Sequence, residues 1–174
     1  MGASISERGA TTMTGETEKR ILRPFSIEDI PWEPRCEHFG GRVKTLANSD
    51  RDNLHLGVHI EELPPGKQSS PFHYHLHEEE HFLILEGEVT LRFGEERILL
   101  KKGDFVTFPA GQKLGHCFIN EGTAPVQYLI VGEARNDDIA VYPDSNKISV
   151  LAAGEIYDKS ATREYWDGEY PGKQ

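Results

Sequence analysis

Cysteine is scarce in this chain of 174 residues, which contains only Cys36 and Cys117. Two cysteines cannot build the disulfide framework of a small secreted domain, so we expect reduced thiols and a cytoplasmic protein. The sequence also lacks any apolar run long enough to cross a membrane. Its N-terminus has no charged start followed by an apolar stretch, so we expect no signal peptide.

Basic residues are too few to balance the acidic ones. The chain has 19 Lys and Arg against 29 Asp and Glu, which gives a formal net charge of −10. Nucleic acids and anionic membrane surfaces repel a protein of this charge. The composition therefore predicts neither nucleic acid nor a membrane as a partner, and leaves small molecules and other protein chains.

The two ends of the chain differ from its middle in composition. Residues 1–20 are rich in Ser, Thr, Gly and Glu and have almost no large apolar residues, so we expect a disordered lead. Residues 151–174 are acidic but aromatic, and we expect this extension to pack on the preceding domain or on a partner subunit. The length of the remainder, about residues 35–150, fits a single domain.

Long amphipathic helices and internal repeats are also missing, and the apolar residues instead follow strand patterns. Residues 54–63 alternate between an apolar face and a polar face. Residues 81–93 contain apolar residues for two strands, with Gly87 between them, and residues 125–134 read as another strand. Many short strands separated by Gly and Pro turns indicate an all-β sandwich or barrel.

A group of histidines in residues 66–87 carries the strongest chemical signal. His73 and His75 are two residues apart, and side chains at this spacing on a strand point to the same face. Two imidazoles can therefore reach one metal ion together. Glu80, five residues after His75, supplies a carboxylate to a mixed nitrogen and oxygen ligand set.

A second segment, residues 103–120, offers a fourth ligand. It begins at Gly103, continues through Pro109 and Gly111, and reaches His116 and then Asn120. Pro109 and the glycines suit tight corners rather than chemistry. His116 is the candidate ligand of this segment.

The two segments together resemble the paired motifs of the cupin superfamily, over roughly residues 33–150. The match departs from the family pattern at Leu114, where the usual histidine would stand, so we interpret the loop as extended by two residues with His116 as the ligand. The resemblance implies an all-β double-stranded β-helix, the cupin or jelly-roll barrel, over residues 35–150. It also implies one divalent metal ion per chain, held by His73, His75, Glu80 and His116, with Fe, Mn, Ni, Cu and Zn all compatible.

Several alternatives remain open within this interpretation. The histidines could form a surface cluster without a ligand role, and Glu79 satisfies the spacing from the histidines as well as Glu80 does. We expect His77 to lie at a turn and His81 to point away from the metal. One position after His116, Cys117 is expected to be a small buried hydrophobe. Two further histidines, His55 and His59, lie on a polar strand face that either lines the pocket or faces solvent.

The resemblance implies a metal-dependent enzyme that acts on a small oxygenated molecule, of oxygenase, isomerase, decarboxylase or lyase type. The alternative is a sensor or storage protein that binds a small ligand without turnover. A metal-free barrel similar to sugar-nucleotide epimerases is a third possibility, against which the intact histidine pair counts. Because an open sandwich must cover its strand edges, we expect a homodimer.

Overall fold

The computed structural model describes residues 23–36, 39–48, 52 and 54–169. The disordered lead predicted for residues 1–20 lies outside the described residues. Within the described part of the chain, no helix is long and apolar enough to cross a membrane.

Short strands are the main regular structure of the described chain, which confirms the all-β prediction. The strands are β1 (Glu33–Pro34), β2 (Arg42–Ala47), β3 (Leu56–Leu63), β4 (Tyr74–His75), β5 (Glu80–Glu86), β6 (Glu88–Phe93), β7 (Glu96–Lys101), β8 (Phe105–Phe108), β9 (His116–Ile119), β10 (Val126–Glu133), β11 (Ile139–Tyr142), β12 (Lys147–Val150) and β13 (Glu155–Asp158). The four segments η1 (Ile27–Asp29), η2 (Pro143–Ser145), η3 (Leu151–Ala153) and η4 (Lys159–Ala161) are single 3₁₀ turns.

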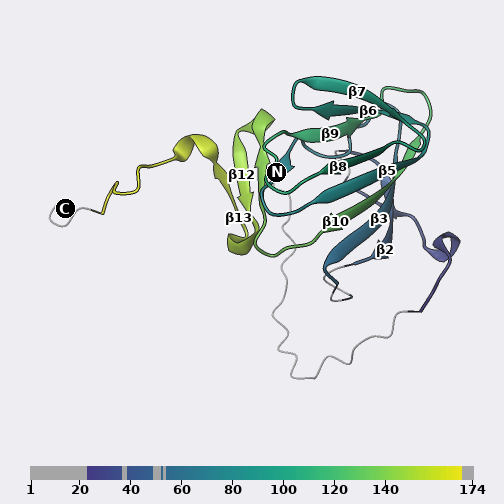
Figure 1. Ribbon diagram of the computed structural model, residues 1–174, viewed down its shortest axis with the longest axis horizontal. Helices are drawn as coiled ribbons and strands as arrows, with labels where there is room; N and C mark the ends of the chain where they lie inside the picture. The colour runs from purple at the N-terminus through teal and green to yellow at the C-terminus, as the bar shows by residue number, and fades with distance from the viewer. Residues whose placement is uncertain (1–22, 37–38, 49–51, 53, 170–174) are drawn as a thin grey trace.

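The strands form three antiparallel sheets that together enclose a barrel (Figure 1). The largest has the order β1-β2-β3-β10-β5-β8, and the sheet β7-β6-β9 faces it across the core. A third sheet, β13-β12-β11-β4, lies at one side of the barrel. Strands distant in sequence are therefore neighbours, as in the pairing of β10 with both β3 and β5.

The core lies between the inner faces of the first two sheets. Alternating residues of each strand point inward, and the resulting cluster is almost entirely aromatic and aliphatic. Its buried members are Leu63, Phe82, Ile84, Val89, Leu91, Phe108, Phe118, Val126 and Tyr128. Such a core depends on apolar packing and not on the candidate metal ligands, so the ligands can be changed separately from the fold.

Glycine is required at two points that shape the barrel. Gly87, between β5 and β6, has φ of 80°, a conformation that side-chain-bearing residues rarely adopt. Gly115 stands directly before β9, where an added Cβ would lie 2.5 Å from the Phe72 ring. The close approach of these two segments places His116 beside His73.

Strand β3 turns its polar face toward the interior of the barrel. Leu63, the last residue of β3, belongs to the core. His59 and Glu61 lie on the same face of the strand as Leu63, because residues two apart on a strand point to the same side. The apolar residues of the alternation lie on the other face of β3, where Leu56 is 44% exposed but Ile60 is buried at 6%. His59 is half-buried and lines a cavity, whereas His55 is exposed.

The C-terminal extension begins as a hairpin and ends as an exposed segment. Strand β13 pairs with β12 at the edge of the third sheet, and residues 151–169 are exposed throughout. In Figure 1 this yellow segment runs away from the barrel. Tyr165 and Trp166 are 82% and 59% exposed and contact each other edge to face. Packing of this segment on a partner subunit stays a prediction.

Candidate metal centre

Two neighbouring segments position the histidine pair and its carboxylate. His75 ends β4, and His73 forms an isolated antiparallel bridge with His116 just before that strand. Glu80 is the first residue of β5, and its partner across the strand pair is Gly132 of β10. An added Cβ at Gly132 would lie 3.6 Å from the Glu80 side chain, so little free space separates this side chain from the sheet.

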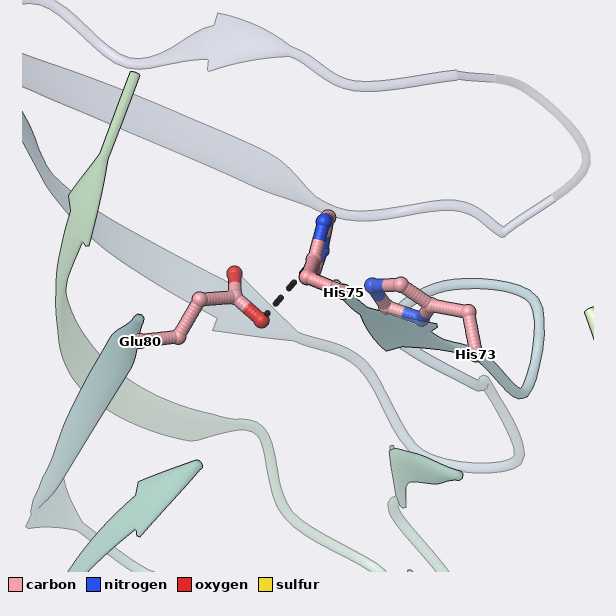
Figure 2. Close-up of side chains that lie close together, drawn as sticks. All are labelled: His73, His75 and Glu80. Carbon is pink, nitrogen blue, oxygen red and sulfur yellow. Dashed lines mark ion pairs between the residues drawn. The ribbon is translucent and has the colours of Figure 1, made fainter. Parts of the chain in front are cut away.

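Ligand atoms of His73, His75 and Glu80 lie within 4.8 Å of one another. We call these three residues the His/Glu cluster. The Nε2 atom of His75 is 3.6 Å from Glu80 Oε2, and Figure 2 shows the Glu80 carboxylate directed toward the two imidazoles. The alternation expected from the sequence therefore brings the two histidines to one side, and the next strand adds the carboxylate.

His116 lies beside this cluster but outside its tight group. Its backbone exchanges two hydrogen bonds with His73, of 3.2 and 2.8 Å, and its Nε2 donates to Glu80 Oε2 at 3.0 Å. The ring is 4% exposed and stacks on Phe108 with 3.7 Å between ring centroids. Its Nδ1 is buried without a hydrogen-bond partner. The structure thus places His116 within reach of Glu80.

Asp138 is a site residue that the sequence analysis missed. Its Oδ2 accepts a hydrogen bond of 2.6 Å from His75 Nδ1, and its Oδ1 accepts one of 3.0 Å from the backbone N–H of His77. A carboxylate that holds one ring nitrogen of a histidine fixes the tautomer and leaves the other nitrogen as a ligand. Asp138 stands in an ordinary polar loop of the sequence, 63 residues from His75, and no motif marks it.

His73 is held in the same manner by the backbone. Its Nδ1 donates to the Pro71 carbonyl at 2.7 Å, so Nε2 carries the free lone pair. Burial and the neighbouring His116 lower the pKa of His73 to about 4. The ring is therefore neutral at physiological pH, as a metal ligand must be.

The charges of the other two cluster members are set by their neighbours. Burial raises the pKa of Glu80, but the hydrogen bond from His116 and the nearby histidines outweigh it and lower that pKa. For His75, burial lowers the pKa, whereas the Asp138 hydrogen bond and the charge of Glu80 raise it above the ordinary value. Glu80 is thus ionised, and His75 is the ring on which protons compete most strongly with a metal.

The neighbouring candidates take other positions. Glu79 pairs with His81 at 2.8 Å, and His81 contacts Thr107 at 3.0 Å, away from the cluster. His77 is exposed and donates to the Asp137 carbonyl. Cys117 is 1% exposed, and burial raises the pKa of its thiol to about 11, so it remains protonated.

The donor set fits a divalent metal ion. Two imidazoles have one nitrogen each engaged by Pro71 or Asp138, which directs the other nitrogen toward an ionised carboxylate. A mixed nitrogen and oxygen set of this kind accepts Fe, Mn, Ni, Cu or Zn. A second group of three, His75, Glu78 and Asp138, shares His75 with the first and surrounds its other nitrogen.

Comparisons with known proteins agree with this picture. Residues 59–132 match the family model described as a cupin domain. Over 95 residues the chain is 33% identical to quercetin 2,3-dioxygenase of Bacillus subtilis, a match that covers 54% of this chain and 28% of that relative. The chain therefore spans less than a third of the length of that relative.

Two solved structures are similar over most of their length. One is a putative sugar phosphate isomerase of Acidithiobacillus ferrooxidans, with 28% identity and a TM-score of 0.73, covering 86% of this chain and 98% of that one. The other is a sugar phosphate isomerase from a cupin superfamily in Silicibacter pomeroyi, with 26% identity and a TM-score of 0.70, covering 83% and 98%. These similarities and the family match confirm the predicted barrel type.

Proposed function

Because this chain carries a cupin domain over residues 59–132, we propose that it is a metal-dependent enzyme acting on a small oxygenated molecule. The observation that carries the proposal is the His/Glu cluster, whose ligand atoms lie within 4.8 Å of one another inside a barrel. In this proposal His73, His75 and Glu80 hold one divalent metal ion, and His116 is the fourth ligand.

A bound divalent metal would supply Lewis-acid polarisation of a substrate oxygen. The chain's own residues prepare the site for that role. Asp138 orients His75 through a 2.6 Å hydrogen bond, and Glu80 is held ionised beside His116. Phe82 and Phe118 form an apolar, aromatic part of the wall of the cavity that His73 and Glu80 line.

Of the reaction types open to the site, isomerisation has the best support. The two similar structures described above are named as sugar phosphate isomerases, one of them as a putative one, and both match over more than four fifths of this chain. An isomerase needs no oxidant and no second substrate. Oxygenase, decarboxylase and lyase activities, and ligand binding without turnover, are the outcomes against which isomerisation is tested.

The test begins with metal analysis of protein purified without added metal, followed by chelation and reloading with single divalent ions. The reloaded protein is then assayed with aldose and ketose phosphates for isomerisation, and with diketones, catechols and hydroxy acids for oxygen uptake. We expect isomerisation that is lost on chelation and in His75→Ala. Stoichiometric metal without turnover of any substrate would favour the binding protein, and absence of bound metal would overturn the proposal.

We also propose that the protein is a homodimer. The exposed aromatic residues Tyr165 and Trp166, in a segment that leaves the barrel, support a contact with a second copy. The cytoplasmic location expected from the sequence stays a prediction.

A further inference from the structure

A cavity of about 130 Å³ inside the barrel is lined by two groups of polar side chains. One is formed by His73, Glu80 and His116, which belong to the candidate metal centre. The other is formed by Arg35, Glu61 and Tyr128, which we call the Glu61 cluster. Neither motif of the sequence contains a residue of the Glu61 cluster, and the proposed function has not used it.

The Glu61 cluster is a buried carboxylate with two donors. Glu61 is 4% exposed, accepts a hydrogen bond of 3.0 Å from the Tyr128 hydroxyl and forms an ion pair with the Arg35 guanidinium. Burial raises the pKa of Tyr128, so its hydroxyl keeps its proton and acts as a donor. Arg35 has 42% of its side chain exposed and also borders an adjacent cavity of about 190 Å³.

Stability alone gives a weak reason for such a pair. Removing a carboxylate and a guanidinium from water is costly, and apolar side chains of similar size often serve the fold equally well. Leu63, two residues after Glu61 on the same strand face, belongs to the apolar core, so an aliphatic residue would also fit at position 61. A charged pair that borders two cavities is therefore better explained by a ligand than by packing.

The strand register places the two polar groups at different heights along β10 and on opposite sides of it, Glu61 on β3 and Glu80 on β5. Glu61 is opposite Tyr128 on β10, and Glu80 is opposite Gly132 on the same strand. These positions on β10 are four residues apart, which corresponds to about 13 Å between Cα atoms in an antiparallel strand. Since the side chains point into one cavity, a ligand of several carbon atoms is needed to contact both groups.

We propose that the Glu61 cluster binds neighbouring hydroxyl groups at one end of a polyhydroxylated substrate, whose other end lies at the His/Glu cluster. This inference rests on the proposed function and names its substrate class. A carboxylate accepts hydrogen bonds from two hydroxyls, while the Arg35 guanidinium donates to their oxygens. Because Glu61 already balances the charge of Arg35, this end of the cavity suits uncharged hydroxyls better than a phosphate or carboxylate.

The apolar part of the wall agrees with the same substrate class. Phe82 lines the same cavity, and its ring contacts that of Tyr128 with 6.2 Å between the ring centroids. Aromatic faces pack against the C–H surfaces of a polyol while hydroxyl groups turn to the polar residues. Ser69 and Ser70 add hydroxyls that can donate or accept on the same wall.

The test compares two ligands with six carbon atoms and the same 2-hydroxy acid head: D-gluconate, which has further hydroxyls, and 2-hydroxyhexanoate, which has none. Calorimetric titrations are made on the full chain, with and without added Mn(II). We expect D-gluconate to bind more tightly by about tenfold or more, the difference expected for hydrogen bonds to a charged group. Glu61→Gln should remove most of that preference, and Tyr128→Phe should reduce it while preserving the ring.

The matched control is Glu62→Gln, because Glu62 follows Glu61 on β3 and points to the opposite face, where it pairs with Arg42. This variant should keep the full preference for D-gluconate. Equal affinity of the parent for both ligands, or failure to bind D-gluconate, would overturn the inference. Tighter binding of 6-phospho-D-gluconate that disappears in Arg35→Met would also overturn it, by assigning the cluster to an anion. Loss of Mn(II) binding alone would instead count against the proposed function.

Discussion

The imidazole of His75 connects two carboxylates: its Nδ1 donates to Asp138, and its Nε2 faces Glu80. Because each ring nitrogen of His75 contacts a carboxylate, the ring has little freedom to rotate away from the His/Glu cluster. Its exposed neighbour His77 instead directs its ring to the Asp137 carbonyl. The two histidines therefore differ in role although both lie in the same short segment.

We predict that His75→Ala loses most of its bound metal and that His77→Ala keeps it. The reason is that, of these two histidines, His75 alone has a ring nitrogen within the His/Glu cluster. Metal content per chain, measured by elemental analysis after identical purification, separates the two variants. Circular dichroism serves as the control, because both variants should retain the strand spectrum of the parent. Equal metal content in the two would argue against the cluster as the binding site.

His116→Ala should weaken metal binding without abolishing it, because His116 reaches Glu80 but lies outside the tightest group. Competition with a metal-sensitive dye measures the affinity. Removing a ring that stacks on Phe108 also loosens packing, so Cys117→Ala, at the next buried position, controls for lost volume. If His116→Ala binds metal as tightly as the parent, the site has three protein ligands and the assignment of His116 is wrong.

Asp138→Asn should change metal binding in two ways. The Asp138 carboxylate helps to raise the pKa of His75, so its loss should move the pH midpoint of metal binding to lower pH. Protons compete with the metal below that midpoint, and affinity rises as the pH increases through it. At pH 8, where competition is small, the variant should bind about 10–100-fold more weakly because His75 is less well oriented. A purely structural role for Asp138 would leave the midpoint unchanged.

At the scale of elements, the approach of β9 to the segment before β4 brings His116 to His73. Gly115 permits this approach, since an added Cβ would lie 2.5 Å from the Phe72 ring. Phe72 is itself fixed, with Arg92 placed 3.7 Å above its ring, so the ring cannot move aside freely.

We therefore predict that Gly115→Ala destabilises the protein by about 1–3 kcal/mol, the usual cost of overpacking. Urea unfolding followed by circular dichroism gives the free energy of unfolding. Gly132→Ala, in β10, is the matched control, because its added Cβ would make an ordinary contact of 3.6 Å with the Glu80 side chain. An equal loss of stability in both variants would point to glycine propensity, and not to the contact with Phe72.

At the scale of the whole molecule, the chain from Lys159 onward extends an exposed aromatic pair, Tyr165 and Trp166, into solvent. We predict that the full chain sediments as a dimer at micromolar concentration. A chain ending at Asp158 retains β13 but lacks this pair, and it should shift toward monomer. A monomeric full chain would remove the homodimer from the proposal, and an unchanged dimer in the shortened chain would place the interface elsewhere.

The sequence by itself determined the barrel and pointed to most residues of the candidate metal centre. Alternation within residues 54–63 and 81–93 is local, and strands β3, β5 and β6 follow it closely. The pair His73 and His75 is local in the same sense, because a spacing of two residues on a strand fixes a shared face. The turn at Gly87, too, follows from a conformation that favours glycine.

Only the tertiary structure decided which distant residues complete the site. Asp138 meets His75 across 63 positions of sequence, and Tyr128 meets Glu61 across 67. The alternation in β3 showed one polar face and one apolar face, but it did not say which face points inward. That choice depends on strand pairing between β3 and β10, and pairing is a property of the assembled sheet that no local pattern contains.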